Sequence, residues 1–509
     1  MSLQPGSLPP HPHDQVLLDN VHPADWVNPE PASSYNLLVV GGGPAGLVAA
    51  AGAAGLGAKV ALVEKNLLGG DCLISGCVPS KGIIRSGRAI RDARNAAEFG
   101  VINGEKLRVD FTAAFDRMRL VRSRLSHHDS ARRFRDELGV DVFFGAARFT
   151  GPDSLAVEEK TLRFHRAAIC TGSSPSVPPV PGLEETGYVT NETVFSLRVC
   201  PERLTVIGGG PIGCELAQAF AYLGSTVTIL NAGPRILPKE DPETSEFIHN
   251  ALERDGIIIY NEVTLVEAAQ TEGSKLLAFE QPDGQRFTLL ADEILVGAGR
   301  TPNVGDLDLE QAGVDYDPRL GVRVDNHLRT GNRRIYAAGD VCSPYKFTHA
   351  ADAMARILIA NALFGGRQKV SNLIIPWCTY TTPEAAHVGL SRSEAEKKGV
   401  AVDTFRVSLS EVDRALLDGE ESGFVTVHLK KGTDKILGAT VVARNAGDMI
   451  NEFTLAMTTG AGLAAIASTI HPYPTQGEAI KKLADSYNRT RLTPGLGKIL
   501  STWLRWKRN

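Results

Sequence analysis

Two stretches of the chain share one pattern of apolar, glycine and polar positions. In residues 37–66 an apolar run, LLVV, leads into closely spaced glycines, a segment of small residues and a second apolar run. Residues 204–233 repeat this order and align with the first stretch without a gap, at an offset of 167 residues (37 to 204). Short apolar runs favour buried strands, and the longer small-residue segment favours a helix. Each stretch is therefore predicted to form a strand–helix–strand unit.

The glycines of both units have the spacing GxGxxG. This spacing allows a tight turn and a close approach of the backbone to a pyrophosphate at a helix N-terminus. Glu64 ends the first unit, where a carboxylate can accept a ribose hydroxyl. Asn231 takes the matching position in the second unit and would not repel a 2′-phosphate, which Arg235 could pair with. We predict two dinucleotide sites that bind two different dinucleotides.

Length and composition indicate a soluble protein of several domains. At 509 residues the chain exceeds a single core, so about three domains are expected. The net charge of −4 gives no general attraction to nucleic acid. Arginines in residues 98–138 alternate with acidic residues, which predicts a solvated helix face. No targeting segment and no membrane-spanning run is visible, so we expect a cytoplasmic protein.

Cys72 and Cys77 are the two cysteines that lie close together in sequence, within GDCLISGCVPSK (Gly70–Lys81). The others are scattered, as is typical of reduced thiols in a cytosol, where a disulfide is usually catalytic. Spacing alone leaves two interpretations open, a redox pair and two packed core residues.

The residues around these cysteines carry a family resemblance. GGxCxxxGCxPSK after a GxGxxG–Glu unit resembles the pyridine nucleotide–disulfide oxidoreductases, which include dihydrolipoamide dehydrogenase, glutathione reductase and mercuric reductase. The segments AICTGS, GRTPN and TGNRRIYAAGD extend the resemblance, which covers residues 35 to about 490. It implies an α/β protein with two Rossmann-like domains, one for FAD and one for NAD(P), and a C-terminal α+β dimerisation domain. It also implies a homodimer whose active site is completed by the partner subunit.

The resemblance implies domain boundaries as well. These are an N-terminal extension (1–34), an FAD domain (35–180 and 301–370), an NAD(P) domain (181–300), a dimerisation domain (371–490) and an amphipathic tail (491–509). The extension is rich in proline and either wanders or drapes over the body. We expect the tail to pack against the body or the partner, with a membrane-surface helix as the alternative.

The site beside the cysteines is predicted to hold FAD, and the second site NADPH, with NADH as the alternative. For FAD, the predicted binding residues are Gly41, Gly43, Gly46, Glu64, Gly70, Thr171, Gly172, Gly339 and Asp340. For the nicotinamide donor they are Gly208, Gly210, Gly213, Asn231, Arg235 and Gly299. No resident metal is predicted.

The resemblance assigns catalytic roles by position. Cys77 would face the flavin as a thiolate, and Cys72 would exchange with substrate. Both need positive surroundings to lower their pKa values. Lys81 would lie near the flavin and pair with Glu215, because an isolated buried charge is costly. Ile74 departs from the asparagine common in the family, which we expect to tune the site.

The segment HPYPTQGE (471–478) departs further from the family. Tyr473 stands where dihydrolipoamide dehydrogenase and glutathione reductase have a proton-shuttling histidine, while Glu478 keeps the position of the acid. A phenol with a pKa of about 10 is a poor base at neutral pH. His471 is not expected to replace that base. A tyrosine here resembles mercuric reductase and mercuric-reductase-like proteins.

We therefore predict that NADPH reduces FAD and that electrons pass through a Cys72–Cys77 disulfide to a small disulfide or a soft-metal substrate. A soft metal has no visible thiol route beyond this pair, because the last cysteine is Cys378. One alternative is a dihydrolipoamide-dehydrogenase-like enzyme, which Tyr473 and Asn231 disfavour. Others are an NAD(P)H:quinone or oxygen reductase that does not use the cysteines, and a flavoprotein that acts mainly as an interaction or membrane-docked partner.

Overall fold

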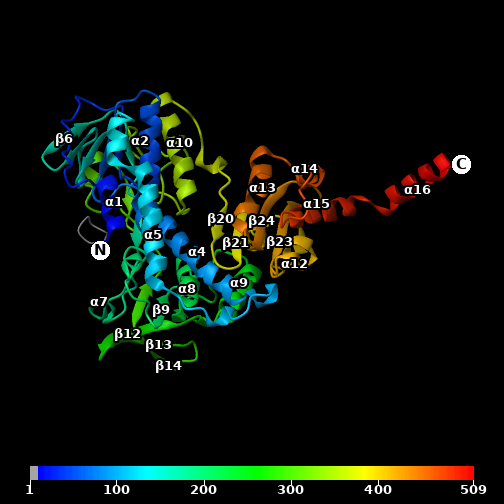
Figure 1. Ribbon diagram of the computed structural model, residues 1–509. Coiled ribbons are helices and arrows are strands. Elements are labelled where there is room, and N and C mark those ends of the chain that lie inside the picture. Colours follow the sequence, from blue (N-terminus) through cyan, green and yellow to red (C-terminus); the bar gives the residue numbers. More distant parts are fainter. Residues whose placement is uncertain (1–9, 509) are drawn as a thin grey trace. The chain divides into compact units, whose positions relative to one another are not determined.

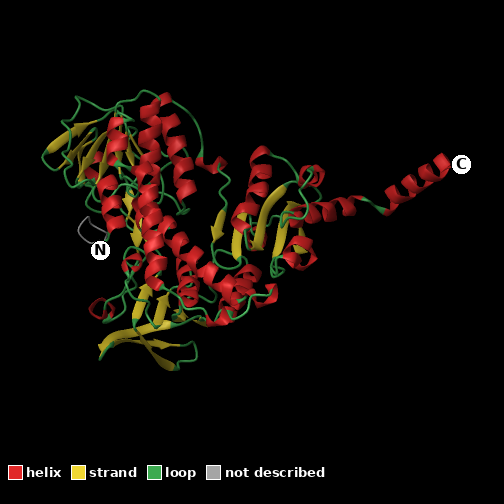
Figure 2. Cartoon of the chain, in the orientation of Figure 1, coloured by secondary structure: helices red, strands yellow, loops and turns green. Residues whose placement is uncertain are grey.

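The computed structural model describes residues 10–508. Its chain divides into two compact units. Unit 1 extends to Ile236 and includes Glu253–Leu373, and unit 2 contains Leu237–Leu252 and the chain from Ile374 onward. Helices and strands are mixed within each unit (Figure 2). No helix of residues 10–508 is long and apolar enough to cross a membrane.

The first sheet of unit 1 is parallel, in the order β19-β7-β1-β2-β3. Its strands are β1 (Leu37–Val40), β2 (Val60–Glu64), β3 (Asp141–Phe144), β7 (Ala167–Ile169) and β19 (Ile335–Ala337). Helix α2 (Pro44–Gly55) connects β1 to β2. In chain order the strands read 3-2-1-4-5 across the sheet, the arrangement of a Rossmann-like dinucleotide fold.

The second sheet of unit 1 repeats this topology, with parallel strands in the order β11-β10-β9-β15. Its strands are β9 (Arg203–Ile207), β10 (Thr226–Leu230), β11 (Ile258–Tyr260) and β15 (Glu293–Val296), and α8 (Pro211–Leu223) connects the first two. Each sheet has a three-stranded antiparallel sheet between its third and fourth strands. These are β4 (Ala147–Gly151), β5 (Ser154–Val157) and β6 (Lys160–Arg163), then β12 (Thr264–Thr271), β13 (Ser274–Glu280) and β14 (Arg286–Ala291). The repeat in sequence is thus a repeat in structure.

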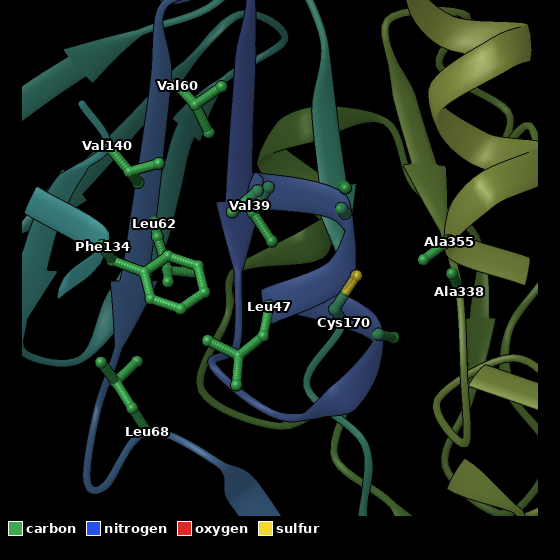
Figure 3. Packing of buried hydrophobic residues seen from close by; sticks show 14 of the residues in the cluster. Val39, Leu47, Val60, Leu62, Leu68, Phe134, Val140, Cys170, Ala338 and Ala355 are labelled. Carbon is green, nitrogen blue, oxygen red and sulfur yellow. The ribbon is translucent and has the colours of Figure 1, made fainter. Parts of the chain in front are cut away.

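Apolar residues of the first sheet pack beneath the glycine turn that follows β1. Val39 and Leu62 are fully buried in a cluster that includes Phe134 and Cys170 (Figure 3). Burial raises the pKa of the Cys170 thiol to about 12. Cys170 is therefore a packing residue rather than a reactive thiol.

Unit 2 is built on a five-stranded antiparallel sheet in the order β20-β21-β24-β23-β22. Its strands are β20 (Trp377–Thr379), β21 (Glu384–Gly389), β22 (Val402–Ser408), β23 (Phe424–Lys430) and β24 (Ile436–Ala443). The helices that follow the sheet are α13 (Ala446–Thr459), α14 (Leu463–Ser468), α15 (Glu478–Arg491) and α16 (Pro494–Arg508). Helices α13, α14 and α15 contribute residues to the core of the unit. Helix α16, the last helix in Figure 1, buries none of its residues.

The N-terminal extension drapes over unit 1 from residue 10 onward. Its helix α1 (Pro12–Val21) packs on α5 (Phe111–Leu125), and Leu17 and Val21 are fully buried (Figure 1). Asn28 then exchanges two hydrogen bonds of 2.8 Å with the backbone of Phe144 at the end of β3. The extension is thus part of the folded unit.

Candidate active site

The first glycine turn is shaped so that side chains cannot enter it. Gly41 has φ +105°, and a Cβ added there would lie 2.4 Å from the carbonyl oxygen of Cys170. A Cβ on Gly46 would lie 1.8 Å from the carbonyl oxygen of Gly41. Gly43 is the N-cap of α2. The turn therefore brings bare backbone to a helix N-terminus, the arrangement that holds a dinucleotide pyrophosphate.

The second glycine turn has the same geometry. Gly208 has φ +114°, and a Cβ on Gly213 would lie 2.0 Å from the carbonyl oxygen of Gly208. Gly210 is the N-cap of α8. Both glycine turns therefore have the geometry that accommodates a dinucleotide pyrophosphate.

Two residues brace these turns: Glu64, the last residue of β2, and Asn231, which directly follows β10. Glu64 accepts hydrogen bonds from the backbone nitrogens of Gly42 (2.6 Å) and Asn66 (2.7 Å), and burial raises its pKa. The Asn231 side chain accepts a bond of 3.3 Å from the nitrogen of Gly209, the counterpart of Gly42. Its amide also donates to the Gly233 carbonyl and the Asn261 side chain, at 3.0 and 2.8 Å. Asn231 thus keeps the bracing role of Glu64 without its charge.

The remaining predicted FAD residues surround the first turn. A Cβ on Gly70 would lie 2.6 Å from Cα of Gly43, so the cysteine segment packs directly on the glycine turn. Gly172 and Gly339 have φ +70° and +83°, in the left-handed region. The Thr171 hydroxyl donates to the Asn303 carbonyl at 2.7 Å. At the second site, Gly299 has φ +128°. The positive φ angles at Gly172, Gly339 and Gly299 favour glycine, and the sequence motifs carried these glycines as their signal.

The two cysteines lie in consecutive helices. Cys72 is in α3 (Gly70–Ile74), and Cys77 is the first residue of α4 (Cys77–Arg94). Both are free thiols. A hydrogen bond from Cys72 is the main cause that lowers the pKa of Cys77 to about 6, and the same bond raises the pKa of Cys72. The expectation of a lowered pKa for both cysteines is therefore wrong for Cys72, and the pair favours a thiolate on Cys77 with the proton on Cys72.

Thr348 lies at the candidate site, although the sequence motifs did not indicate it. It is the first residue of α10 (Thr348–Phe364), and its Oγ1 lies 3.4 Å from Sγ of Cys77. This hydroxyl contributes to the lowered pKa of Cys77. A helix N-terminus also stabilises a nearby anion.

Lys81 and Glu215 form the predicted pair. Nζ of Lys81 donates to Oε2 of Glu215 at 2.8 Å, from α4 to α8. Glu215 is buried, while the lysine side chain is partly exposed. The charge on Lys81 lowers the pKa of Cys77. The pair therefore connects α8, the helix of the second glycine turn, to α4, the helix that begins with Cys77.

Asp71, which precedes Cys72, is a second residue that the motifs did not indicate. Its carboxylate accepts bonds from Ser75 Oγ (2.7 Å) and Asn191 Nδ2 (3.0 Å) and pairs with Nη2 of Arg300 at 2.9 Å. Arg300 also donates to Oγ of Ser173 at 2.8 Å, and that hydroxyl donates to Asp340 at 2.7 Å. The network therefore connects the cysteine segment to predicted FAD residue Asp340.

The other predicted catalytic residues lie in unit 2. Tyr473 is 69% exposed and its hydroxyl donates to Oδ2 of Asp413 at 2.8 Å. This bond raises the pKa of Tyr473. Lys482 connects Asp413 (3.7 Å) with Glu478 (3.2 Å), so Tyr473 and Glu478 belong to one cluster. The Tyr473 hydroxyl therefore keeps its proton and serves as a hydrogen-bond donor to Asp413.

His471 is held by two acceptors. Its Nε2 lies 2.9 Å from Oε1 of Glu452, and its Nδ1 lies 3.1 Å from the carbonyl oxygen of Thr469. Both ring nitrogens therefore lie within hydrogen-bond distance of an acceptor. That His471 does not replace the missing base stays a prediction.

Comparisons with known proteins agree with this site. The chain matches the family described as pyridine nucleotide-disulphide oxidoreductase over residues 35–355, and its dimerisation domain over residues 375–484. The chain therefore belongs to the pyridine nucleotide–disulfide oxidoreductases. This membership confirms the predicted fold class of two Rossmann-like domains and a dimerisation domain, in a family that uses FAD and a pyridine nucleotide. The exact domain boundaries stay predictions.

Named relatives cover most of the chain. It is 34% identical over 458 residues to a mercuric reductase of Lysinibacillus sphaericus, covering 90% of this chain and 83% of the relative. It is 33% identical over 453 residues to a dihydrolipoyl dehydrogenase of Bacillus subtilis, covering 88% and 95%. The HOCl-induced flavoprotein disulfide reductase RclA of Escherichia coli has a similar structure, with a TM-score of 0.79 and 26% identity over 89% of this chain and 99% of that chain.

Proposed function

We propose that this protein is an NADPH-dependent flavoprotein reductase that passes electrons through a Cys72–Cys77 disulfide to a small disulfide or a soft-metal ion. One observation carries this proposal: Cys77, the first residue of α4, has the Cys72 thiol, the Thr348 hydroxyl and the Lys81 charge around it, and these groups lower its pKa. Such a pair is arranged for thiol–disulfide exchange or metal binding, since the thiolate is the reactive form.

Bound FAD supplies hydride acceptance from the nicotinamide and two-electron transfer to the disulfide. The residues proposed to hold it are the glycines of the first turn, Glu64, Gly70 and Asp340. Lys81 keeps a positive charge beside Cys77, and Glu215 compensates that charge. When the disulfide takes up two electrons the S–S bond breaks. One proton goes to Cys72, and Cys77 remains a thiolate.

The raised pKa of the Tyr473 hydroxyl makes it a poor base. This favours a substrate whose reduction needs no base at this position. With a disulfide substrate, Cys72 must lose its proton before it attacks. The Cys77 thiolate can accept this proton through the hydrogen bond that joins the two cysteines. With a soft-metal dication, binding of the ion displaces the proton of Cys72 to solvent, and two thiolates hold the ion. The two thiolates then give two electrons to the ion and close to the S–S bond again. The raised pKa of Tyr473 thus argues against a lipoamide-type histidine mechanism.

The comparisons support the same substrate classes. Several relatives are named mercuric reductase, and the structural neighbour from Escherichia coli has been solved as a Cu(II) complex. We infer that the chain works as a homodimer in a reducing cytoplasm. In that dimer the Tyr473–Glu478 cluster of one subunit would complete the dithiol site of the other.

Anaerobic reduction of the purified enzyme with NADPH tests the proposal. We expect a long-wavelength thiolate–flavin charge-transfer absorbance after addition of one equivalent. This absorbance should be lost on acidification with a midpoint near the Cys77 pKa of about 6, because protonation removes the thiolate. Reoxidation with a panel of disulfides and Hg(II) would then identify the substrate. A reduced enzyme without this absorbance at any pH contradicts the assignment of Cys77.

Arg235 is expected to determine the preference for NADPH. The Arg235→Met variant should raise KM for NADPH about 10–100-fold, the loss expected for a charge-assisted hydrogen bond of about 1.5–3 kcal/mol. KM for NADH should change little, since NADH lacks the 2′-phosphate. Steady-state kinetics with both nucleotides measures this, with Lys239→Gln, in the same loop, as the matched control. Equal effects on both nucleotides would refute a phosphate role.

A further inference from the structure

Both ends of the chain lie outside the segments that match the family, residues 35–355 and 375–484. One inference concerns each end. The first rests on the proposed dithiol function, and the second is independent of it.

At the N-terminal end, Asp14 of α1 is a buried acid that gathers two buried arginines of α5. Its Oδ1 accepts a bond of 2.7 Å from Nη2 of Arg122, and its Oδ2 lies 3.5 Å from Nε of Arg119. Asp14 is 2% exposed and each arginine 1%. Buried charges of this kind persist only when they are paired, so Asp14 fixes the position of Arg122.

Arg122 in turn contacts the segment between the two cysteines. Its Nη1 donates to the carbonyl oxygen of Ile74 at 2.8 Å. Ile74 is the last residue of α3, where helical carbonyls lack partners within the helix and a cation is favourable. The extension also holds the start of the segment, because the Val21 carbonyl accepts a bond of 3.2 Å from the nitrogen of Leu68.

We propose that the N-terminal extension is a brace for the redox segment, and that Asp14 is a positioning residue that acts on Cys72 and Cys77 through Arg122 and the Ile74 carbonyl. The hydrogen bond from the Cys72 thiol to Cys77 requires α3 and the first turn of α4 to keep their relative position. The brace supplies a fixed point between them. Loss of the brace weakens the hydrogen bond from Cys72 to Cys77, so a smaller fraction of Cys77 is a thiolate at a given pH.

Two variants interrupt this chain of contacts at different points, Asp14→Asn and Arg122→Met. Asp25→Asn is the matched control, because Asp25 belongs to the same extension and pairs with Arg132 at 2.7 Å on the surface. The groups that act directly on Cys77 include Cys72, Thr348, Lys81 and Asp71, and no variant alters them.

The readouts are the pH midpoint of the charge-transfer absorbance and hydrogen exchange of the amides in residues 69–78, measured on flavin-loaded dimers. In Asp14→Asn and Arg122→Met the midpoint should rise by about half a pH unit or more, roughly a threefold change in the thiolate equilibrium. Exchange in residues 69–78 should become faster by a similar factor. Asp25→Asn should match the wild type in both. The double variant should shift no further than the larger single one, since both act through one contact.

Unchanged midpoint and exchange in Asp14→Asn would overturn the brace, as would equal shifts in Asp25→Asn. An effect of Arg122→Met alone would also overturn the role of the extension. If the wild type gives no charge-transfer absorbance, the proposed function fails instead, and hydrogen exchange alone then decides the brace.

At the C-terminal end, α16 has an apolar face and a basic face. With 3.6 residues per turn, one face carries Leu496, Ile499, Leu500, Trp503, Leu504 and Trp506. The opposite face carries Lys498, Arg505 and Arg508. Nζ of Lys507 lies 4.4 Å from the centre of the Trp503 ring, along the apolar face. None of these residues is buried in the described chain.

The charge of this helix indicates its partner. No acidic residue follows Asp485, whereas α15, which packs on the core, pairs Lys481 with Asp485. A helix that only packs on protein has no need of an outer face that carries cations alone. Cations opposite a face of tryptophan, leucine and isoleucine are typical of helices that lie on anionic membranes. At 15 residues, α16 is about 22 Å long, too short to span a bilayer.

We infer that α16 docks on the surface of an anionic phospholipid bilayer, with its tryptophans at the headgroup level. The test uses the full-length flavin-loaded protein with vesicles of phosphatidylcholine alone or mixed with phosphatidylglycerol. We expect at least tenfold more protein to sediment with the anionic vesicles, and less as salt is raised. Leu500→Lys should lose binding although it adds a cation, while the matched Ser501→Lys, on the polar face, should keep or gain it.

Equal binding to both vesicles, or none to anionic vesicles, would overturn the inference. So would equal effects of Leu500→Lys and Ser501→Lys. If deletion of residues 494–509 dissociates the dimer, α16 is a subunit contact and the inference is wrong.

Discussion

A Cys72→Ser enzyme is expected to lose roughly 10³–10⁶-fold of its turnover with disulfide or soft-metal acceptors, the scale on which removal of an enzymatic nucleophile acts. A Cys77→Ser enzyme should lose as much, because the pair must close to a disulfide. The two should differ in their spectra. In Cys72→Ser the serine hydroxyl can still donate to Cys77, whose thiolate is then present without reduction. We expect charge-transfer absorbance in that variant as isolated and none in Cys77→Ser.

The control for both variants is Cys200→Ser. Cys200 lies outside the redox segment, and its Sγ is 3.3 Å from Ser225 Oγ, a contact that a serine can keep. All three variants should bind flavin and reduce ferricyanide with NADPH as the wild type does, since this reaction needs no dithiol. If Cys72→Ser kept full turnover with the physiological acceptor, the quinone or oxygen reductase interpretation would replace the dithiol mechanism.

The nucleotide sites could be predicted from sequence because their chemistry is local. Gly41 and Gly46 contact each other's backbone within one turn, so a fixed spacing of glycines carries the geometry. The same holds for Gly208 and Gly213. Glu64 and Asn231 reach these turns from the end of the next strand, which a parallel strand pairing places alongside.

The surroundings of the cysteines could not be predicted in this way. Thr348 contacts Cys77 from 271 residues away, and Asp14 acts from 108 residues before Arg122. Such contacts depend on how separate elements pack, and no spacing within a motif encodes them. From sequence alone, an aspartate in a proline-rich extension is expected to be solvated. The structure instead buries Asp14 against Arg119 and Arg122. The sequence thus indicated the two cysteines that are proposed to react, while the residues packed around them became visible only in the fold.

The Lys81→Met enzyme is expected to keep only about half of its Cys77 thiolate at neutral pH. Lys81 lowers the pKa of Cys77, so its removal should raise the midpoint of the charge-transfer absorbance by about one pH unit, a tenfold loss in the thiolate equilibrium. The variant should also be less stable, because it leaves the buried carboxylate of Glu215 without this cation. Partial exposure of Lys81 limits that cost to about 1–3 kcal/mol.

A second substitution separates these two effects. In Lys81→Met/Glu215→Met both charges are gone, and replacement of a buried pair by apolar residues of similar size is often neutral for stability. The urea concentration at the midpoint of unfolding should therefore return close to the wild-type value. The pH midpoint of the charge-transfer absorbance should stay high, because the charge of Lys81 is still missing beside Cys77. Lys81→Arg, which keeps the charge, should retain a low thiolate midpoint. If the double variant recovered both stability and thiolate, Lys81 would act on Cys77 only through the packing of α4 on α8, and its charge would have no part in the chemistry.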